Sequence, residues 1–204
     1  MELYQQRSYA KCVSEGYGFL AKNVWTVSKT MTPYFIVFSL FFVLSNAVNT
    51  HANVSILANR PVTLEEVMIA IIVTVLWVAA YIICLVRLYR FFKKHCGIEG
   101  KRKIRFGKVI KAIFRHFGKV LGTTLLSLFI LVVLSLLAYL PYMVSMYAYF
   151  SSVEAQVNFG DTATIPYSGL ALMIFAGTFC YTIINLISVG FYASLMFLYG
   201  SIRK

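Results

Sequence analysis

The stretch "VMIAIIVTVLWVAAYIICLVRL", Val67–Leu88, decides the fold of this chain. It carries no charged residue before Arg87 and is apolar almost throughout. A helix needs about 20 such residues to cross the hydrocarbon core of a bilayer. A helix that is apolar on every side belongs either in the core of a large protein or in a membrane. In a chain of 204 residues, the stretch predicts a membrane-spanning helix.

Three other stretches are also long and apolar, namely Pro33–Ala47, Val120–Phe150 and Leu170–Tyr199. The first is the shortest, and the other two exceed the minimum length, which implies tilt, a kink or projection beyond the membrane. Overall, 60% of residues are hydrophobic and 13% are charged, whereas soluble domains carry about 25% charged residues. We therefore predict an all-α integral membrane protein with four transmembrane helices in one domain, residues 1–204.

The basic residues are distributed unevenly between the two sides of these spans. Of the 19 Lys and Arg residues, all but Arg60 precede the first span, follow the fourth, or lie between the second and third spans or at their inner ends. The opposite loops hold mainly acids, Glu65, Glu66, Glu154 and Asp161. Because basic loops stay in the cytoplasm, we expect both termini and the middle loop to be cytoplasmic. We expect an inner or plasma membrane, and the compactness of the chain favours a bacterial one.

An amphipathic helix is predicted before each pair of spans. Apolar residues recur at helical spacing before the first span, and we expect that helix to end near Thr32, because Pro33 disfavours a helical conformation in the residue before it. These residues are Tyr9, Val13, Tyr17, Leu20, Val24 and Val27. The corresponding stripe before the third span is Phe106, Val109, Ile110, Ile113, Phe114, Phe117 and Leu121.

The chain therefore reads as two similar halves, residues 8–92 and 102–202, each an amphipathic cytoplasmic helix followed by a helical hairpin. The halves share little side-chain identity, so this is a possible duplication of architecture. Within the first half, "TLEE", Thr63–Glu66, has the pattern of a capping box at the start of the second span, with Thr63 as N-cap.

The segment "KRKIRFGKVIKAIFRHFGKV", residues 101–120, is the most basic in the chain. Its non-basic face is uniformly apolar and it leads directly into a span, so the interpretation as an interfacial helix on anionic lipid is favoured over nucleic-acid binding. Charges that merely enforce topology are the alternative. The predicted lipid-binding residues are Arg105, Lys108, Lys111, Phe114, Arg115, Phe117 and Lys119.

The central portions of the spans contain no Asp, Glu, Lys, Arg or His, which argues against a proton- or ion-coupled transporter. A passive pore built by oligomerisation would need a polar stripe, and the candidates are Ser39, Ser45, Asn46, Asn49 and Asn185. For Asn185, an interhelical hydrogen bond is the favoured explanation. Pro141 is expected to kink the third span. An aromatic belt is favoured over an outward-facing cavity as the explanation of the nearby aromatic residues, Tyr139, Tyr142, Tyr147, Tyr149 and Phe150. Three pairs of small residues at i and i+4 are candidates for close helix contacts, namely Ala176 with Cys180, Thr178 with Thr182, and Gly190 with Ser194.

Catalytic and metal-binding patterns are missing. The four cysteines form no C-x-x-C pair, and a lipid-modifying enzyme would require His51, Glu154 and Asp161 to converge. We predict no cofactor and no metal. The favoured function is a non-enzymatic scaffold or accessory subunit that binds anionic lipid and a membrane-protein partner or another copy of itself. A small oligomeric transporter or channel is the alternative.

Overall fold

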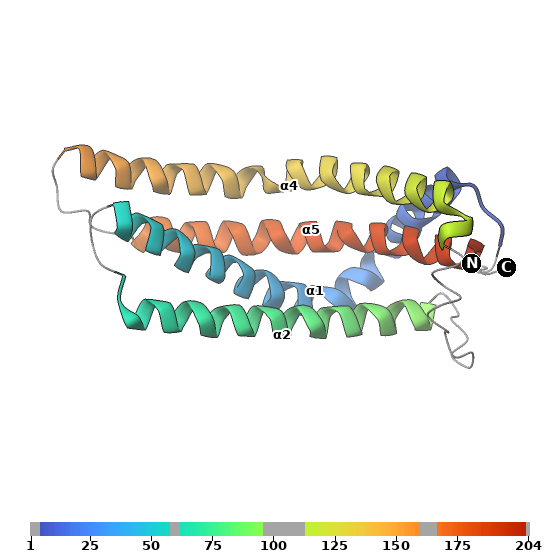
Figure 1. Ribbon diagram of the computed structural model, residues 1–204, viewed down its shortest axis with the longest axis horizontal. Coiled ribbons are helices and arrows are strands. Elements are labelled where there is room, and N and C mark those ends of the chain that lie inside the picture. Colours follow the sequence, from blue (N-terminus) through green and yellow to red (C-terminus); the bar gives the residue numbers. More distant parts are fainter. Residues whose placement is uncertain (1–4, 58–61, 96–112, 160–166, 203–204) are drawn as a thin grey trace. The chain divides into compact units, whose positions relative to one another are not determined.

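The computed structural model describes residues 5–57, 62–95, 113–159 and 167–202, which are helical over almost their whole length and contain no strand. The long helices are α1 (Tyr9–Leu57), α2 (Leu64–His95), α4 (Phe117–Asn158) and α5 (Tyr167–Ile202) (Figure 1). By length and composition, all 4 could cross a membrane. Each contains one predicted span, so the all-helical fold with four candidate transmembrane helices is confirmed.

Helix α1 breaks at a different residue from the one predicted. It continues through Pro33, and the non-helical residue is Asn23, with φ −114° and ψ 15°. The expectation that the first helix ends near Thr32 is therefore wrong. Proline is tolerated inside membrane-spanning helices, where neighbouring helices and side chains satisfy the backbone group that it frees. The Asn23 side chain instead competes for the preceding turn, because its Nδ2 donates to the carbonyl of Phe19 at 2.9 Å.

The start of α2 is capped as the sequence predicts. The backbone N–H of Thr63 donates to Glu66 Oε2 at 2.8 Å, and the backbone N–H of Glu66 donates to Thr63 Oγ1 at 3.3 Å. This reciprocal pair is a capping box, and it satisfies two backbone donors that the first turn of a helix leaves without partners. The capping box predicted from "TLEE" is confirmed.

The chain divides into two compact units. The first unit comprises Met1–Met31, Leu85–Ser135 and Asn185–Lys204, and the second comprises Thr32–Cys84 and Leu136–Ile184. These units do not follow the predicted halves of the sequence, because each takes segments from both. The duplication stays a prediction.

The core of the first unit is built around Phe19, which is 4% exposed. Its ring lies 6.3 Å from that of Phe91 and 6.0 Å from that of Phe92, both near the end of α2. It also meets the ring of Phe197 in α5 edge-on at 6.5 Å. Aromatic pairs at these separations stabilise a core beyond the area that they bury. The segment of α1 before Asn23 is thereby packed against two other helices.

The core of the second unit includes tyrosines that the sequence assigned to an aromatic belt. Tyr142 and Tyr149 are both 3% exposed and pack in one cluster with Val43 of α1 and Met173 of α5. Tyr147, in contrast, is 75% exposed, so it is the one of these three tyrosines that a lipid-facing position fits. Tyr142 and Tyr149 are seven residues apart and therefore share a helix face. The belt interpretation is wrong for these two buried rings.

Helices α2 and α4 expose large apolar side chains along their lengths. In water such a surface would be a site of association or aggregation, but against lipid it needs no further cover. The exposure of so many large apolar side chains agrees with the interpretation of these helices as membrane spans. Examples are Ile71, Ile82 and Val86 in α2, and Leu125, Phe129, Leu137 and Val144 in α4.

Candidate functional site

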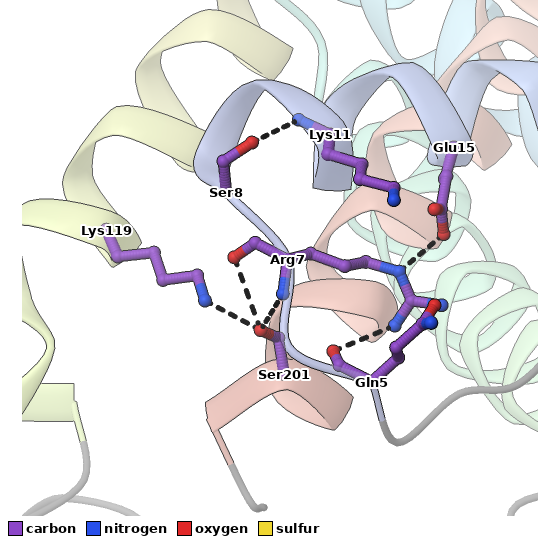
Figure 2. A network of polar contacts seen from close by, with 7 residues as sticks. All are labelled: Gln5, Arg7, Ser8, Lys11, Glu15, Lys119 and Ser201. Carbon is purple, nitrogen blue, oxygen red and sulfur yellow. Dashed lines mark hydrogen bonds and ion pairs between the residues drawn. The ribbon is translucent and has the colours of Figure 1, made fainter.

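A polar cluster in the first unit joins the N-terminal segment to the end of α5 (Figure 2). The Ser201 hydroxyl accepts from the backbone N–H of Arg7 at 2.9 Å and from Lys119 Nζ at 2.6 Å. The same hydroxyl donates to the carbonyl of Arg7 at 3.4 Å. A serine hydroxyl has one proton and two lone pairs, so its full hydrogen-bonding capacity is used here.

The guanidinium of Arg7 is buried, and its side chain is only 2% exposed. Nε donates to Glu15 Oε2 in an ion pair, and Nη1 donates to the carbonyl of Gln5 at 3.2 Å. The guanidinium carbon also lies 5.1 Å from the centre of the Phe197 ring, within the range of a cation–π contact. Arg7 is therefore a buried cation that is neutralised, hydrogen-bonded and stacked.

The sequence around Arg7 explains how the cluster forms. Ser8 is the N-cap of α1. Its Oγ accepts a hydrogen bond from the backbone N–H of Lys11 at 3.3 Å, and its carbonyl accepts one from the backbone N–H of Cys12 at 3.1 Å. Arg7 consequently lies just outside the helix, where its side chain reaches back along the first turns. Glu15 is two turns into α1 and meets it there.

Small residues bring this segment of α1 close to α5. A Cβ added to Gly16 would lie 2.5 Å from the backbone nitrogen of Ser194 and closer still to its hydroxyl. A Cβ added to Gly190 would lie 2.7 Å from Cδ1 of Tyr17, whose hydroxyl donates to the carbonyl of Ser127 in α4 at 2.9 Å. The predicted close contact at Gly190 and Ser194 is confirmed, and its partner is the beginning of α1.

The apolar stripe predicted for this segment is only partly buried. Val13 is 2% exposed and Val27 is 0% exposed, but Tyr9 and Val24 are 51% and 58% exposed. Cys12, Gly16 and Phe19, which the prediction omitted, are buried instead. The buried face of this segment therefore includes Gly16, whose Cα side lies against Ser194, and differs from the stripe that hydrophobicity alone selects.

The predicted lipid-binding segment is described from Ile113 onward. Phe114 and Phe117 are 74% and 56% exposed, and Arg115 between them is exposed as well. Lys119 is half-buried, with its ammonium on Ser201. The remaining predicted residues, Arg105, Lys108 and Lys111, lie outside the described residues.

The end of α2 belongs to the same unit and is also basic. All of its cations are exposed to the surroundings of the protein. We use the name basic rim for the exposed residues of this end of α2 and of residues 114–117, which belong to the same unit. The rim consists of Arg87, Arg90, Lys93, Lys94, Phe114, Arg115 and Phe117.

The predicted pore residues do not form one described stripe. Asn46 is half-buried and Asn49 is exposed, and both belong to the second unit. Asn185 is half-buried in the first unit, where its backbone carbonyl accepts from Ser188 Oγ at 2.7 Å. Helix α4 continues on both sides of Pro141, whose carbonyl accepts from Ser145 Oγ at 2.7 Å. The kink at Pro141 stays a prediction.

Within the described ranges, no group of three His, Cys, Asp or Glu side chains could hold a metal ion. Cys12, Cys84 and Cys180 are free and buried. The convergence of His51, Glu154 and Asp161 is untested, because Asp161 and the side chain of His51 lie outside what the structure describes. No protein-family model, curated protein or solved structure matches this chain.

Sequence reasoning missed the cluster of Arg7, Glu15 and Ser201. A weak signal was present, since Glu15 is an isolated acid among basic residues and Arg7 directly precedes an N-capping serine. The third member, Ser201, is 194 positions from Arg7. Nothing in the local sequence indicates that pairing.

Proposed function

We propose that this chain is a non-enzymatic multi-pass membrane protein that binds anionic lipid at its cytoplasmic face and serves there as a scaffold or accessory subunit. Its four candidate spans form two helical hairpins, with both termini and the basic middle loop in the cytoplasm. The basic rim carries this proposal, because exposed Phe114 and Phe117 flank exposed Arg115. The cationic end of α2 belongs to the same unit.

The chemistry of an interfacial surface favours this interpretation of the rim. Exposed phenylalanines can enter the boundary between headgroups and acyl chains, and cations beside them then meet phosphate. Each such cation contributes about 1 kcal/mol near an anionic surface. Arg105, Lys108 and Lys111 extend the rim in sequence and are part of the proposed lipid site.

The Arg7 cluster supports a structural role for the first unit. Arg7 and Lys119 both contact Ser201, and Glu15 neutralises Arg7. These contacts fix the first turns of α1 against α4 and α5. A unit held in this way would present the rim to lipid, or to a partner membrane protein, without reorganisation.

The test is lipid retention by the intact protein. Native mass spectrometry after release from mixed nanodiscs should show retention of phosphatidylglycerol over phosphatidylcholine. Replacing Lys111 and Arg115 by glutamine should weaken that preference about thirtyfold, from roughly 1 kcal/mol for each of the two cations. Replacing Lys22 and Lys29, which lie outside the rim, removes the same charge and should change it little. Lipid binding at the rim would be refuted if both double variants lost the preference for phosphatidylglycerol equally, or if the wild type had no such preference.

A small oligomeric transporter or channel is the second candidate. Asn49 lines a groove in the second unit together with Glu66 and Thr74, which supplies polar groups on two helices. This function predicts solute flux in proteoliposomes that Asn185→Leu abolishes without unfolding the protein. A bare homo-oligomer without lipid preference, found by the same mass spectrometry, would favour it.

A further inference from the structure

A groove of about 410 Å³ lies in the second unit between the end of α1 and the start of α2. Its walls are mainly apolar and include Val48, Ala70 and Ile71. Its polar groups are Asn49 and Glu66, with Thr74 as a third. Sites for small molecules commonly have about 300–1,000 Å³, apolar walls and a few polar groups. The groove meets all of these conditions.

At the Thr74 end of the groove, a polar contact joins the two helices. Ser45 Oγ and Thr74 Oγ1 are 3.5 Å apart, and Thr74 Oγ1 also donates to the carbonyl of Ala70 at 2.7 Å. From this contact the groove runs toward Asn49 on α1 and Glu66 on α2. The acid therefore lies at the end opposite the Ser45–Thr74 contact.

The charge at that end is opposite to that of the whole protein. The chain has a formal net charge of +12, yet the charged residues between Val48 and Val75 are Arg60, Glu65 and Glu66. The Glu66 carboxylate is fixed by the capping box, in which Oε2 accepts from the backbone N–H of Thr63 at 2.8 Å. An oriented carboxylate at the end of an apolar groove favours a ligand that is both apolar and positively charged.

We propose that this groove binds lipophilic monocations. Apolar groups of the ligand contact Val48, Ala70 and Ile71, and its positive charge lies near Glu66. The site is separate from the basic rim, whose ligands are anionic headgroups. It also needs no particular oligomeric state.

The experiment uses two probes of the same shape and opposite charge, tetraphenylphosphonium and tetraphenylborate. Isothermal titration calorimetry with the full chain in phosphatidylcholine nanodiscs, corrected against empty nanodiscs, should show saturable binding of the cation and none of the anion. Glu66→Gln should weaken cation binding about fivefold, the upper value for a partly exposed ion pair. Glutamine also completes a capping box, so this variant keeps the helix start intact.

Two further variants separate the site from general effects. Glu65→Gln removes the same charge from the adjacent position, which does not line the groove, and should leave affinity within twofold. Ala70→Trp fills the groove and should abolish saturable binding. Equal binding of both probes, equal effects of the two glutamate variants, or unchanged binding to the filled groove would each overturn the proposal.

Discussion

Arg7 shows how a single residue can be both costly and necessary in this protein. Its buried guanidinium would be strongly unfavourable alone, and Glu15 is the acid that pairs with it. Ser201 and Lys119 then satisfy the surrounding polar atoms. Because the members of the cluster depend on one another, removing one leaves the others in an unfavourable environment.

Glu15→Ala should therefore destabilise the protein by about 3 kcal/mol, because it leaves Arg7 as an unpaired buried charge. The measurement is the free energy of unfolding in detergent micelles by titration with dodecyl sulfate. Glu154→Ala is the matched control, since Glu154 is exposed on α4 and its loss should change stability little. The double variant Arg7→Met/Glu15→Met should recover most of the stability. A double variant as unstable as Glu15→Ala would contradict the burial argument.

At this scale the sequence predicted local features better than distant ones. The Thr63–Glu66 capping box requires only residues three apart, so a four-residue pattern sufficed. The Arg7–Ser201 contact joins the two ends of the chain, and neither residue has a pattern of its own. The lipid ligands predicted in residues 105–111 stay predictions.

At the scale of the element, the beginning of α1 is governed by its glycines. Gly16 lies against the backbone of Ser194, so α1 and α5 approach more closely there than any side chain would allow. A Cβ added to Gly18, which lies on another face, would meet no neighbouring atom within 4 Å. The two glycines thus differ in what they contribute, although they are two residues apart.

Gly16→Ala should destabilise the first unit by about 2 kcal/mol or more, because its methyl group would force the two helices apart. Gly18→Ala should be neutral or stabilise by up to about 1 kcal/mol through helix propensity. Thermal unfolding of both variants, monitored by circular dichroism, makes the comparison. If the two substitutions had the same effect, the close contact at Gly16 would not hold.

The start of α2 provides a second test at the scale of the element. Thr63→Ala removes the N-cap acceptor and should cost about 1 kcal/mol locally. Hydrogen–deuterium exchange at the Glu66 amide should become faster, whereas in Glu66→Gln it should keep its protection, since the Thr63 acceptor remains. Exchange that is unchanged in Thr63→Ala would show that the box adds no local stability.

The helices themselves could be predicted because apolar length is a property of contiguous sequence. The break in α1 could not be placed, since Pro33 is the stronger sequence signal and Asn23 acts through a bond to Phe19 that only the folded helix makes. Likewise, the spacing of Tyr142 and Tyr149 in the sequence is the same whether their helix face contacts lipid or protein. The burial of Tyr142 and Tyr149 depends on Val43 and Met173, which come from other helices.

At the scale of the whole molecule, composition and charge distribution lead to one arrangement. Four apolar helices are long enough to cross the membrane, and the basic residues collect on one side of the predicted spans, with Arg60 as the exception. The proposed lipid site and the proposed cation groove both take their chemistry from this asymmetry. The orientation of the chain is therefore the claim on which a cytoplasmic lipid site depends.

Impermeant maleimide labelling of intact cells tests that claim most directly. The starting variant has all four cysteines, Cys12, Cys84, Cys96 and Cys180, replaced by alanine. Single cysteines are then introduced into it in place of Arg60, Lys103 or Asp161. We expect labelling from outside at positions 60 and 161, and labelling at 103 only after permeabilisation. External labelling at 103, or protection at 60 or 161 until the membrane is opened, would contradict the four-span arrangement with a cytoplasmic basic loop.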